Sequence, residues 1–246
     1  MRIKLSFEAK DSNNIILPVH YNHILQAFIY NNITKELAEF LHDKGYSYGK
    51  RTFKLFVFSR IFSRRFSIKE DKILFEKSIS FYISSPVNEF IKQIAETFLK
   101  IENDIRIGEN NLIMKELFTP PKPNFQDTIQ INMISPVTIY STITVNNKKK
   151  TYYYSPFEDE FQELLKSNLQ KKFYAFTGSQ IDFDFKIKPI GVNKNFEKIV
   201  YYKNTVVKGW MGKYEITTEK NILEFAYDTG LGSKNSQGFG MFEICS

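Results

Sequence analysis

A glycine-rich segment near the C-terminus, GLGSKNSQGFG at residues 230–240, is the most specific chemical feature of this sequence. Glycine lets the backbone adopt positive φ and approach a ligand closely. Exposed N–H groups in such a loop can cradle phosphates, and Lys234 adds positive charge. The segment is not a Walker loop, because no Gly-Lys-Ser/Thr follows, and no helix of a parallel unit follows to make a dinucleotide fingerprint. The spacing alone leaves a phosphate site and a structural turn equally open.

Basic side chains gather in two places that could grip a polyanion. One stretch surrounds a predicted strand and contains Lys50, Arg51, Arg60, Arg64 and Arg65. The other is Lys148–Lys150 in a predicted hairpin turn after Asn146-Asn147. Contacts to phosphates give sequence-independent affinity that falls with salt, and the alternative for each stretch is a solvated charge run.

Two further features have a structural and a functional interpretation. Trp210 lies between Gly209 and Gly212, where it either stacks on an unpaired base or packs as a buried hairpin residue. His20 and His23 have a His-x-x-His spacing, but two ligands on one face do not define a metal site. We interpret both histidines as surface or helix-start residues.

The composition excludes several classes of protein. The 246 residues carry 34 Lys and Arg against 27 Asp and Glu, a net charge of +7 that favours a polyanionic partner. With Cys245 as the single cysteine and three histidines, we expect no internal disulfide, no cysteine zinc site, no metal and no cofactor. No run of about 18 apolar residues exists to span a membrane, and the alternating N-terminus is no secretory signal. A cytoplasmic protein is expected.

The first half of the chain shows alternating strands and periodic helices in the order β-α-β-β-α-β. Residues 2–9 alternate like a strand, and helical spacing follows over 21–30 and again after Thr34. Residues 53–62 alternate, with Phe53, Leu55, Val57 and Ser59 on one face. A strand at 72–84 and a helix after Ser85-Pro86 follow, and a further strand ends near Phe118.

A proline cluster, Pro120, Pro121 and Pro123, is the best linker in the chain. Beyond it a less regular unit of the same order begins, with strand pattern over 128–145. Its first helix starts at the capping box Ser155-Pro156-Phe157-Glu158. The economical interpretation is an α+β protein of two ferredoxin-like domains, at 1–121 and 125–246, and the alternative is one continuous α+β domain.

Four segments resemble the CRISPR repeat-RNA-processing endoribonucleases of the RAMP superfamily. They are the glycine-rich segment with Met241, the helix YNHILQAFIY at 21–30, KLFVFS at 54–59 and Ser135-Pro136-Val137. Their order along nearly the whole chain is more specific than any one of them. The resemblance implies tandem ferredoxin-like, RRM-like domains that cleave precursor CRISPR RNA within its repeats without metal. Attack by the ribose 2′-OH would give a 2′,3′-cyclic phosphate and a 5′-OH.

The resemblance also implies a catalytic set of Tyr30, His42 and Lys54 in the first domain. Histidine suits acid or base work because its unperturbed pKa lies near neutrality, and positive charge stabilises the transition state. Lys50 and Arg51 compete with Lys54, and the assignment of acid and base stays open. The expected RNA-binding residues are Lys50, Arg51, Arg60, Arg64, Arg65, Gly230, Gly232, Lys234, Gly238 and Gly240.

The expected partner is the CRISPR repeat RNA, as precursor and as product. Subunits of a CRISPR effector complex and a second copy of the chain are further partners that the resemblance allows. The main rival function is a non-catalytic RNA-binding RAMP subunit, which has no need of His42 and Tyr30. A small-molecule-binding ferredoxin-like module is the second rival, disfavoured by the basic charge.

Overall fold

The computed structural model describes residues 1–100, 105–145 and 148–245. The N-terminal half folds around an antiparallel sheet with the strand order β5-β8-β1-β10-β9. The strands are β1 (Arg2–Ala9), β5 (Val57–Phe58), β8 (Ser78–Ser84), β9 (Ile105–Ile107) and β10 (Asn110–Phe118). Helices α1 (Asn22–Asn31) and α3 (Asn88–Lys100) pack on the sheet and enclose one hydrophobic core.

Period-two alternation explains how β1 fits this core. Ile3, Leu5 and Phe7 are buried, because alternate side chains of a strand point to the same face. The helix predicted after Ser85-Pro86 is α3, which buries Phe90, Ile91, Ile94 and Phe98 with the 3.6-residue period of an amphipathic helix. Leu99, expected on the same face, is 77% exposed.

The first half also contains shorter elements outside the main sheet and its two helices. A separate three-stranded sheet contains β2 (Asn14–Pro18), β7 (Lys72–Glu76) and β6 (Phe66–Lys69). After α1 come α2 (Lys35–Glu39), a π-helical turn η1 (Phe40–Lys44) and the hairpin β3 (Tyr46–Tyr48) to β4 (Arg51–Phe53). The Thr34 hydroxyl accepts a bond from the Leu37 N–H, so the predicted cap of the second short helix is confirmed.

The C-terminal half repeats the arrangement around a sheet of order β14-β17-β11-β18. Its strands are β11 (Thr128–Met133), β14 (Phe185–Ile190), β17 (Lys213–Thr218) and β18 (Phe242–Ile244), with helices α4 (Asp159–Thr177) and α5 (Lys220–Thr229). Two ribbons are added, β12 (Tyr140–Val145) with β13 (Lys148–Tyr153) and β15 (Glu197–Tyr202) with β16 (Thr205–Trp210). Short 3₁₀ turns lie at η2 (Lys194–Phe196) and η3 (Asn235–Gln237).

Both main sheets have the ferredoxin-like topology. In each, the first strand lies between the third and the fourth, and the second strand lies at the edge beside the third. The predicted α+β class with tandem β-α-β-β-α-β units is therefore confirmed. The two cores take their buried residues from 3–112 and from 125–242, on either side of the proline cluster. The domain bounds 1–121 and 125–246 stay a prediction.

Three predictions of local structure were wrong. The strand expected over 53–62 is reduced to β5, because Leu55 has φ 52° and turns the chain. The strand expected over 72–84 divides into β7 and β8 at Lys77, whose φ is 57°. The helix expected to start at Ser155-Pro156 starts at Asp159 instead, with Glu158 as its N-cap and no side-chain cap bond, although Glu158 accepts from the Ser155 N–H. Phe157 lies before this helix and is 55% exposed.

Two predicted features of the second half can also be placed. Trp210 is 7% exposed and packs edge-on against Phe157, so the interpretation as a buried hairpin residue is confirmed. Lys148–Lys150 belong to strand β13 rather than to a turn, and the expected turn at 146–147 lies outside the described residues.

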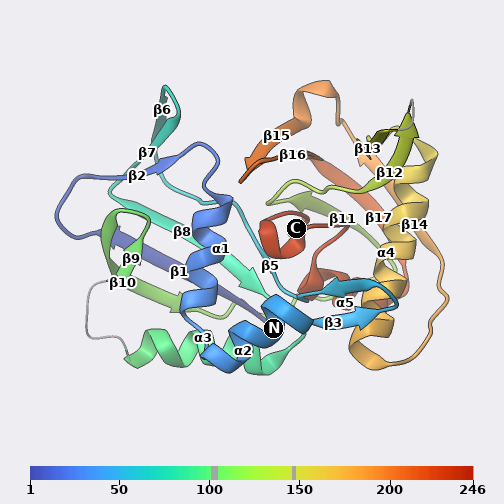
Figure 1. Cartoon of the computed structure of the whole chain (residues 1–246), viewed down its shortest axis with the longest axis horizontal. Coiled ribbons are helices and arrows are strands. Elements are labelled where there is room, and N and C mark those ends of the chain that lie inside the picture. Colours follow the sequence, from blue (N-terminus) through green and yellow to red (C-terminus); the bar gives the residue numbers. More distant parts are fainter. Residues whose placement is uncertain (101–104, 146–147, 246) are drawn as a thin grey trace.

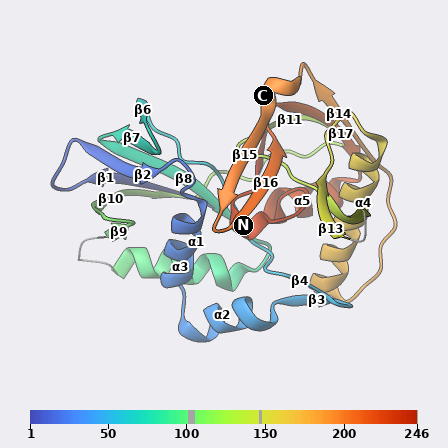
Figure 2. The same cartoon turned by 45° about the horizontal axis from the view of Figure 1, so that its top comes forward.

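The two halves are joined by buried polar and apolar contacts. The Arg2 guanidinium, 5% exposed, donates to the Phe242 and Tyr227 carbonyls and lies 3.4 Å over the Tyr227 ring. Val57 packs with Ile134 and Met241. The C-terminal segment after α5 lies between the halves (Figure 1), and the β3–β4 hairpin of the first half reaches α4 of the second (Figure 2).

The glycine-rich loop fits between the halves because four of its positions lack a side chain. Gly230, Gly232, Gly238 and Gly240 all have positive φ. A Cβ at Gly238 would lie 2.5 Å from the Phe58 ring, and one at Gly240 would overlap the Leu231 carbonyl oxygen. The loop is thus a packed connection between domains.

Gly240→Ala tests this packing. We expect a loss of at least about 3 kcal/mol in the free energy of unfolding, because strain at positive φ is joined by a backbone overlap that cannot relax locally. Gly178→Ala is the control, with φ +76° and nothing within 4 Å of its Cβ, and should cost only about 1–2 kcal/mol. Urea unfolding measures both, and equal losses would contradict a packed loop.

Candidate functional site

The segment 53–56 contains Lys54 and contacts the other two predicted catalytic residues, His42 and Tyr30. The Lys54 ammonium donates to the His42 carbonyl oxygen at 2.6 Å. Phe56 packs edge-on against the Tyr30 ring, with centroids 5.8 Å apart. The turn at Leu55 allows this arrangement, because it lets Lys54 face His42 while Phe56 enters the core beside Tyr30.

His42 lies at the surface in the π-helical turn η1, which Gly45 ends with φ 60°. Its ring Nδ1 lies 2.6 Å from Oδ1 of Asp43, the distance of a hydrogen bond from a ring N–H to a carboxylate. This bond leaves Nε2 as the nitrogen that can meet a substrate. Asp43 was not singled out from the sequence, although its position next to His42 was the available signal.

Tyr30 is half-buried on α1. Burial raises the pKa of its phenol to about 12, and the nearby Tyr202 acts in the same direction. Tyr30 therefore stays protonated at neutral pH and can donate a hydrogen bond, but it is a poor base. Tyr30 and His42 contact different residues of segment 53–56, and none of the described contacts joins their side chains.

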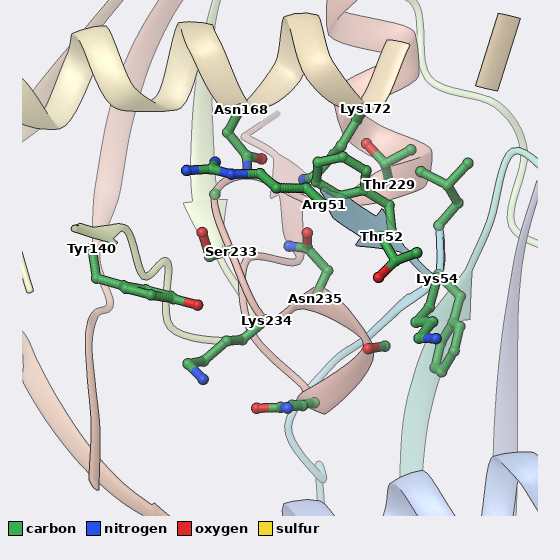
Figure 3. Close-up of a pocket in the computed structure, with 16 residues that line it drawn as sticks. Arg51, Thr52, Lys54, Tyr140, Asn168, Lys172, Thr229, Ser233, Lys234 and Asn235 are labelled. Atoms are coloured by element: carbon green, nitrogen blue, oxygen red, sulfur yellow. The ribbon is translucent and has the colours of Figure 1, made fainter. Parts of the chain in front are cut away.

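A cavity of about 390 Å³ lies beside Lys54, where the two halves meet. Segment 51–56 forms one wall, α4 forms another, and the glycine-rich loop with Tyr140 completes the lining. Figure 3 shows Asn168 and Lys172 descending from a helix at the top, with Lys234 and Asn235 on the loop below them. The cavity contains four cationic side chains, those of Arg51, Lys54, Lys172 and Lys234.

Among the described residues that line this cavity, none is acidic. The excess of positive charge suits a bound polyanion, because a dry or half-dry cavity strengthens each charge–charge interaction. Burial lowers the pKa of Lys54, opposed by Asp43, and it also lowers that of Lys234. The Lys234 ammonium lies 5.2 Å from the centre of the Tyr140 ring.

Lys172 and Asn168 were missed in the sequence analysis. They are 2% and 5% exposed, and burial lowers the pKa of Lys172 to about 7. Phe161, Leu165, Asn168 and Lys172 follow one another at helical spacing along the buried face of α4. The available signal was that an amide residue and a charged residue continue the apolar stripe of this helix.

The glycine-rich loop contributes differently from the prediction. The N–H groups of Gly230, Gly238 and Gly240 donate to the carbonyl oxygens of Ala226, Asn235 and Pro136. All four predicted glycines, Gly230, Gly232, Gly238 and Gly240, are buried. Their role in this structure is to let the loop pack, and residues 233–237 are the half-exposed part that faces the cavity.

The predicted basic stretch is divided by the fold. Lys50 and Arg51 lie at the β3–β4 turn, and Arg51 lines the cavity. Arg60 lies in a separate depression with Asn195 and Lys198. Arg64 and Arg65 are exposed beside β6, where Arg65 faces Glu76 at 3.9 Å. The three arginines therefore do not join the cavity, and contact with RNA at their sites stays a prediction.

The described residues contain no group of three or more His, Cys, Asp and Glu placed to hold a metal ion. His23 Nδ1 lies 3.0 Å from the His20 carbonyl oxygen, and the His20 ring packs against Tyr201. Within the described part of the chain, no helix has the length and apolar character that a membrane crossing requires.

Family comparisons cover nearly the whole chain. The family described as CRISPR associated protein Cas6, C-terminal, matches residues 119–244. The family described as CRISPR-associated protein Cas6, N-terminal, matches residues 16–118. The junction falls at the predicted proline-rich linker.

Individual relatives match over at least nine-tenths of their length. A protein named CRISPR-associated endoribonuclease Cas6 1, from Methanocaldococcus jannaschii, is 30% identical over 98% of this chain and 91% of its own. CRISPR-associated endoribonuclease Cas6 from Pyrococcus furiosus is 26% identical over 99% and 90%. A solved structure named CRISPR associated protein Cas6 superposes with a TM-score of 0.80 and 28% identity, covering 100% of this chain and 99% of that one.

The buried Lys172 predicts how stability depends on pH. With a pKa near 7 in the folded chain and 10.5 as its ordinary value, the unfolded chain binds more protons between these values, so stability rises with pH from about 7. Between about pH 7 and 9, the free energy of unfolding of the wild type should rise by up to about 1.4 kcal/mol per pH unit relative to that of Lys172→Met.

Urea unfolding at several pH values measures this difference. Lys186→Met, which removes an exposed lysine of β14, is the control and should run parallel to the wild type. A parallel profile for Lys172→Met as well would contradict a buried lysine with a lowered pKa.

Proposed function

The chain belongs to the Cas6 family of CRISPR-associated proteins, and from this membership we propose that it is an endoribonuclease that cleaves precursor CRISPR RNA within its repeats. The observation that carries the proposal is the full-length similarity to a protein named CRISPR-associated endoribonuclease. A cationic cavity beside Lys54 and His42 supports it, because RNA cleavage requires positive charge at the reacting phosphate. The proposed partner is the repeat RNA.

The proposed reaction is attack of a ribose 2′-OH on the adjacent phosphate. The bond from O2′ to phosphorus forms and the bond from phosphorus to O5′ breaks, which gives a 2′,3′-cyclic phosphate and a 5′-OH. One proton leaves the 2′-OH and one reaches O5′. The reaction therefore needs a base and an acid, and the proposed chemistry does not require a metal ion.

The geometry supports a division of roles. His42 is the proposed base, because its Nε2 is not engaged by Asp43 and Tyr30, with a pKa near 12, holds its proton. Tyr30 donates a hydrogen bond to the reacting phosphate or to O5′. Lys54 supplies positive charge, and its bond to the His42 carbonyl keeps the two residues together. In substrate-free enzymes such groups often tighten only when substrate binds.

The first test is a cleavage assay with 5′-labelled repeat RNA in excess EDTA. One discrete cut, abolished by a single 2′-deoxy at the cleaved position, is the expected result, because the attacking hydroxyl is then missing. Loss of cleavage in EDTA with recovery in Mg²⁺ would contradict the proposed chemistry. Salt-sensitive binding without any cut would contradict the nuclease and favour a non-catalytic RNA-binding subunit.

The second test assigns the residues by single-turnover cleavage. His42→Ala should lower the rate about 10²–10⁴-fold, the range for loss of a proton-transfer group, while RNA affinity stays near that of the wild type. Tyr30→Phe and Lys54→Ala should also lower the rate more than the affinity. His23→Ala removes another exposed histidine on the same half and should cut at the wild-type rate. A fully active His42→Ala would contradict the assignment.

Effector-complex subunits and a second copy of the chain stay predictions from the resemblance, and a cytoplasmic location stays a prediction from the sequence. The cleavage assay needs none of them, since it uses the isolated chain and RNA alone.

A further inference from the structure

Two neighbouring side chains of α4 point into the cavity and have no function in the proposed cleavage step. Asn168 and Lys172 are one helical turn apart, are almost fully buried, and both line the cavity (Figure 3). Buried polar groups are normally paired, so a lysine and an amide placed together in an apolar helix face need an explanation.

Asn168 leaves a buried acceptor unpaired. Its Oδ1 has no hydrogen-bond partner among the described residues, although the side chain is 5% exposed. An unpaired acceptor opposes folding, because its bonds to water are lost without replacement. Asn168 lines the cavity, so a small rotation of its amide would bring this acceptor to a ligand that carries an N–H or O–H donor.

Lys172 provides positive charge beside this acceptor. Its Nζ donates to the Gly230 carbonyl at 2.8 Å, which uses one N–H of the ammonium. Within the described residues, Lys172 forms no ion pair with a carboxylate, and burial alone accounts for its lowered pKa. The neighbouring charged groups of the cavity are Arg51, Lys54 and Lys234, all of the same sign, so an anion is the complementary ligand.

The position of the pair separates it from the bond to be cut. Lys54 lines the cavity, but Tyr30 and His42 do not. A phosphate held by Lys172 and Lys234 would therefore belong to a nucleotide beside the cleaved bond. The volume of about 390 Å³ falls at the lower end of the range for ligand pockets and suits one nucleotide rather than a folded helix of RNA.

We propose that Asn168 and Lys172 form the floor of a nucleotide subsite that holds the RNA next to the cleaved bond. Lys172, with Lys234 and Arg51, binds a phosphate, and Asn168 Oδ1 accepts a hydrogen bond from the base or the 2′-OH of the same nucleotide. This inference rests on the proposed endoribonuclease function and assigns specificity to one flanking position. Both residues act by positioning, since neither is placed at the reacting atoms.

Asn168→Leu tests the acceptor. Leucine has a similar size and no polar atom, so the variant should unfold at the wild-type temperature or above, while its affinity for uncleavable 2′-deoxy repeat RNA falls about tenfold. A structural asparagine would give the opposite result, with lower stability and unchanged RNA binding, and that result would overturn the proposal.

A scan of the RNA identifies the nucleotide. Single abasic or 2′-deoxy changes are introduced at each position that flanks the cut. At one position the change should lower the affinity of the wild type about tenfold. The same change should not lower the affinity of Asn168→Leu any further. If the losses from the RNA change and from Asn168→Leu add at every position, the proposed contact between Asn168 and a nucleotide is overturned. Independent contacts add, whereas two changes that remove the same contact do not.

Lys172→Met provides a second route if the leucine variant fails to fold. It should reduce the slope of log affinity against log salt by about 0.7, the loss of one phosphate contact on a single strand. Lys171→Met, on the next residue and outside the cavity lining, should keep the wild-type slope. Equal slopes for Lys172→Met and the wild type would overturn the phosphate contact.

The controls separate this inference from the function on which it rests. If the wild type binds repeat RNA but does not cut it, the nuclease proposal fails while the subsite is still tested by affinity. If the wild type cuts and both Asn168→Leu and Lys172→Met behave like it, the subsite alone is overturned.

Discussion

The close fit of a glycine-rich loop between two ferredoxin-like domains is the constraint on which the rest of the structure depends. Gly238 lies against Phe58 and Asn22 of the first half, and Gly232 lies against Thr138 of the second. Asn22 and Gln26 of α1 bind the loop through the carbonyl oxygens of residues 236–238. These contacts fix the distance between the halves, and the cavity next to Lys54 exists because that distance is held.

The packing of the two halves around the loop also has an electrostatic consequence. With the halves held together, α4 buries Lys172 against the Gly230 carbonyl, and four cations share a cavity whose described lining has no acidic residue. Burying Lys172 opposes folding, since its ammonium loses hydration without gaining a carboxylate partner. A site that binds RNA phosphates gains from the same property, because the substrate supplies the missing negative charge. The lowered pKa of Lys172 is the measurable sign of this conflict.

The sequence was sufficient for the architecture and insufficient for the site. Alternation in β1 and the helical period of α3 reflect burial directly, so the tandem order could be predicted. Leu55 and Lys77 adopt positive φ, which no hydrophobic pattern records, and the strands around them were therefore predicted too long. The basic residues from Lys50 to Arg65 were predicted to surround one strand because the sequence does not reveal the turn at Leu55. Lys172 was missed because the helical stripe was traced through apolar residues alone.

The most direct test of the account is where the RNA next to the cut lies on the protein. Repeat RNA blocked by one 2′-deoxy, with 4-thiouridine beside the blocked bond, can be photocrosslinked and the attached peptide identified by mass spectrometry. The account predicts crosslinks in segment 51–56, in residues 229–237 or in α4 near Asn168, which surround the cavity. Crosslinks confined to the exposed strands β6 and β7 would contradict it, because the cleaved bond would then lie away from Lys54 and His42.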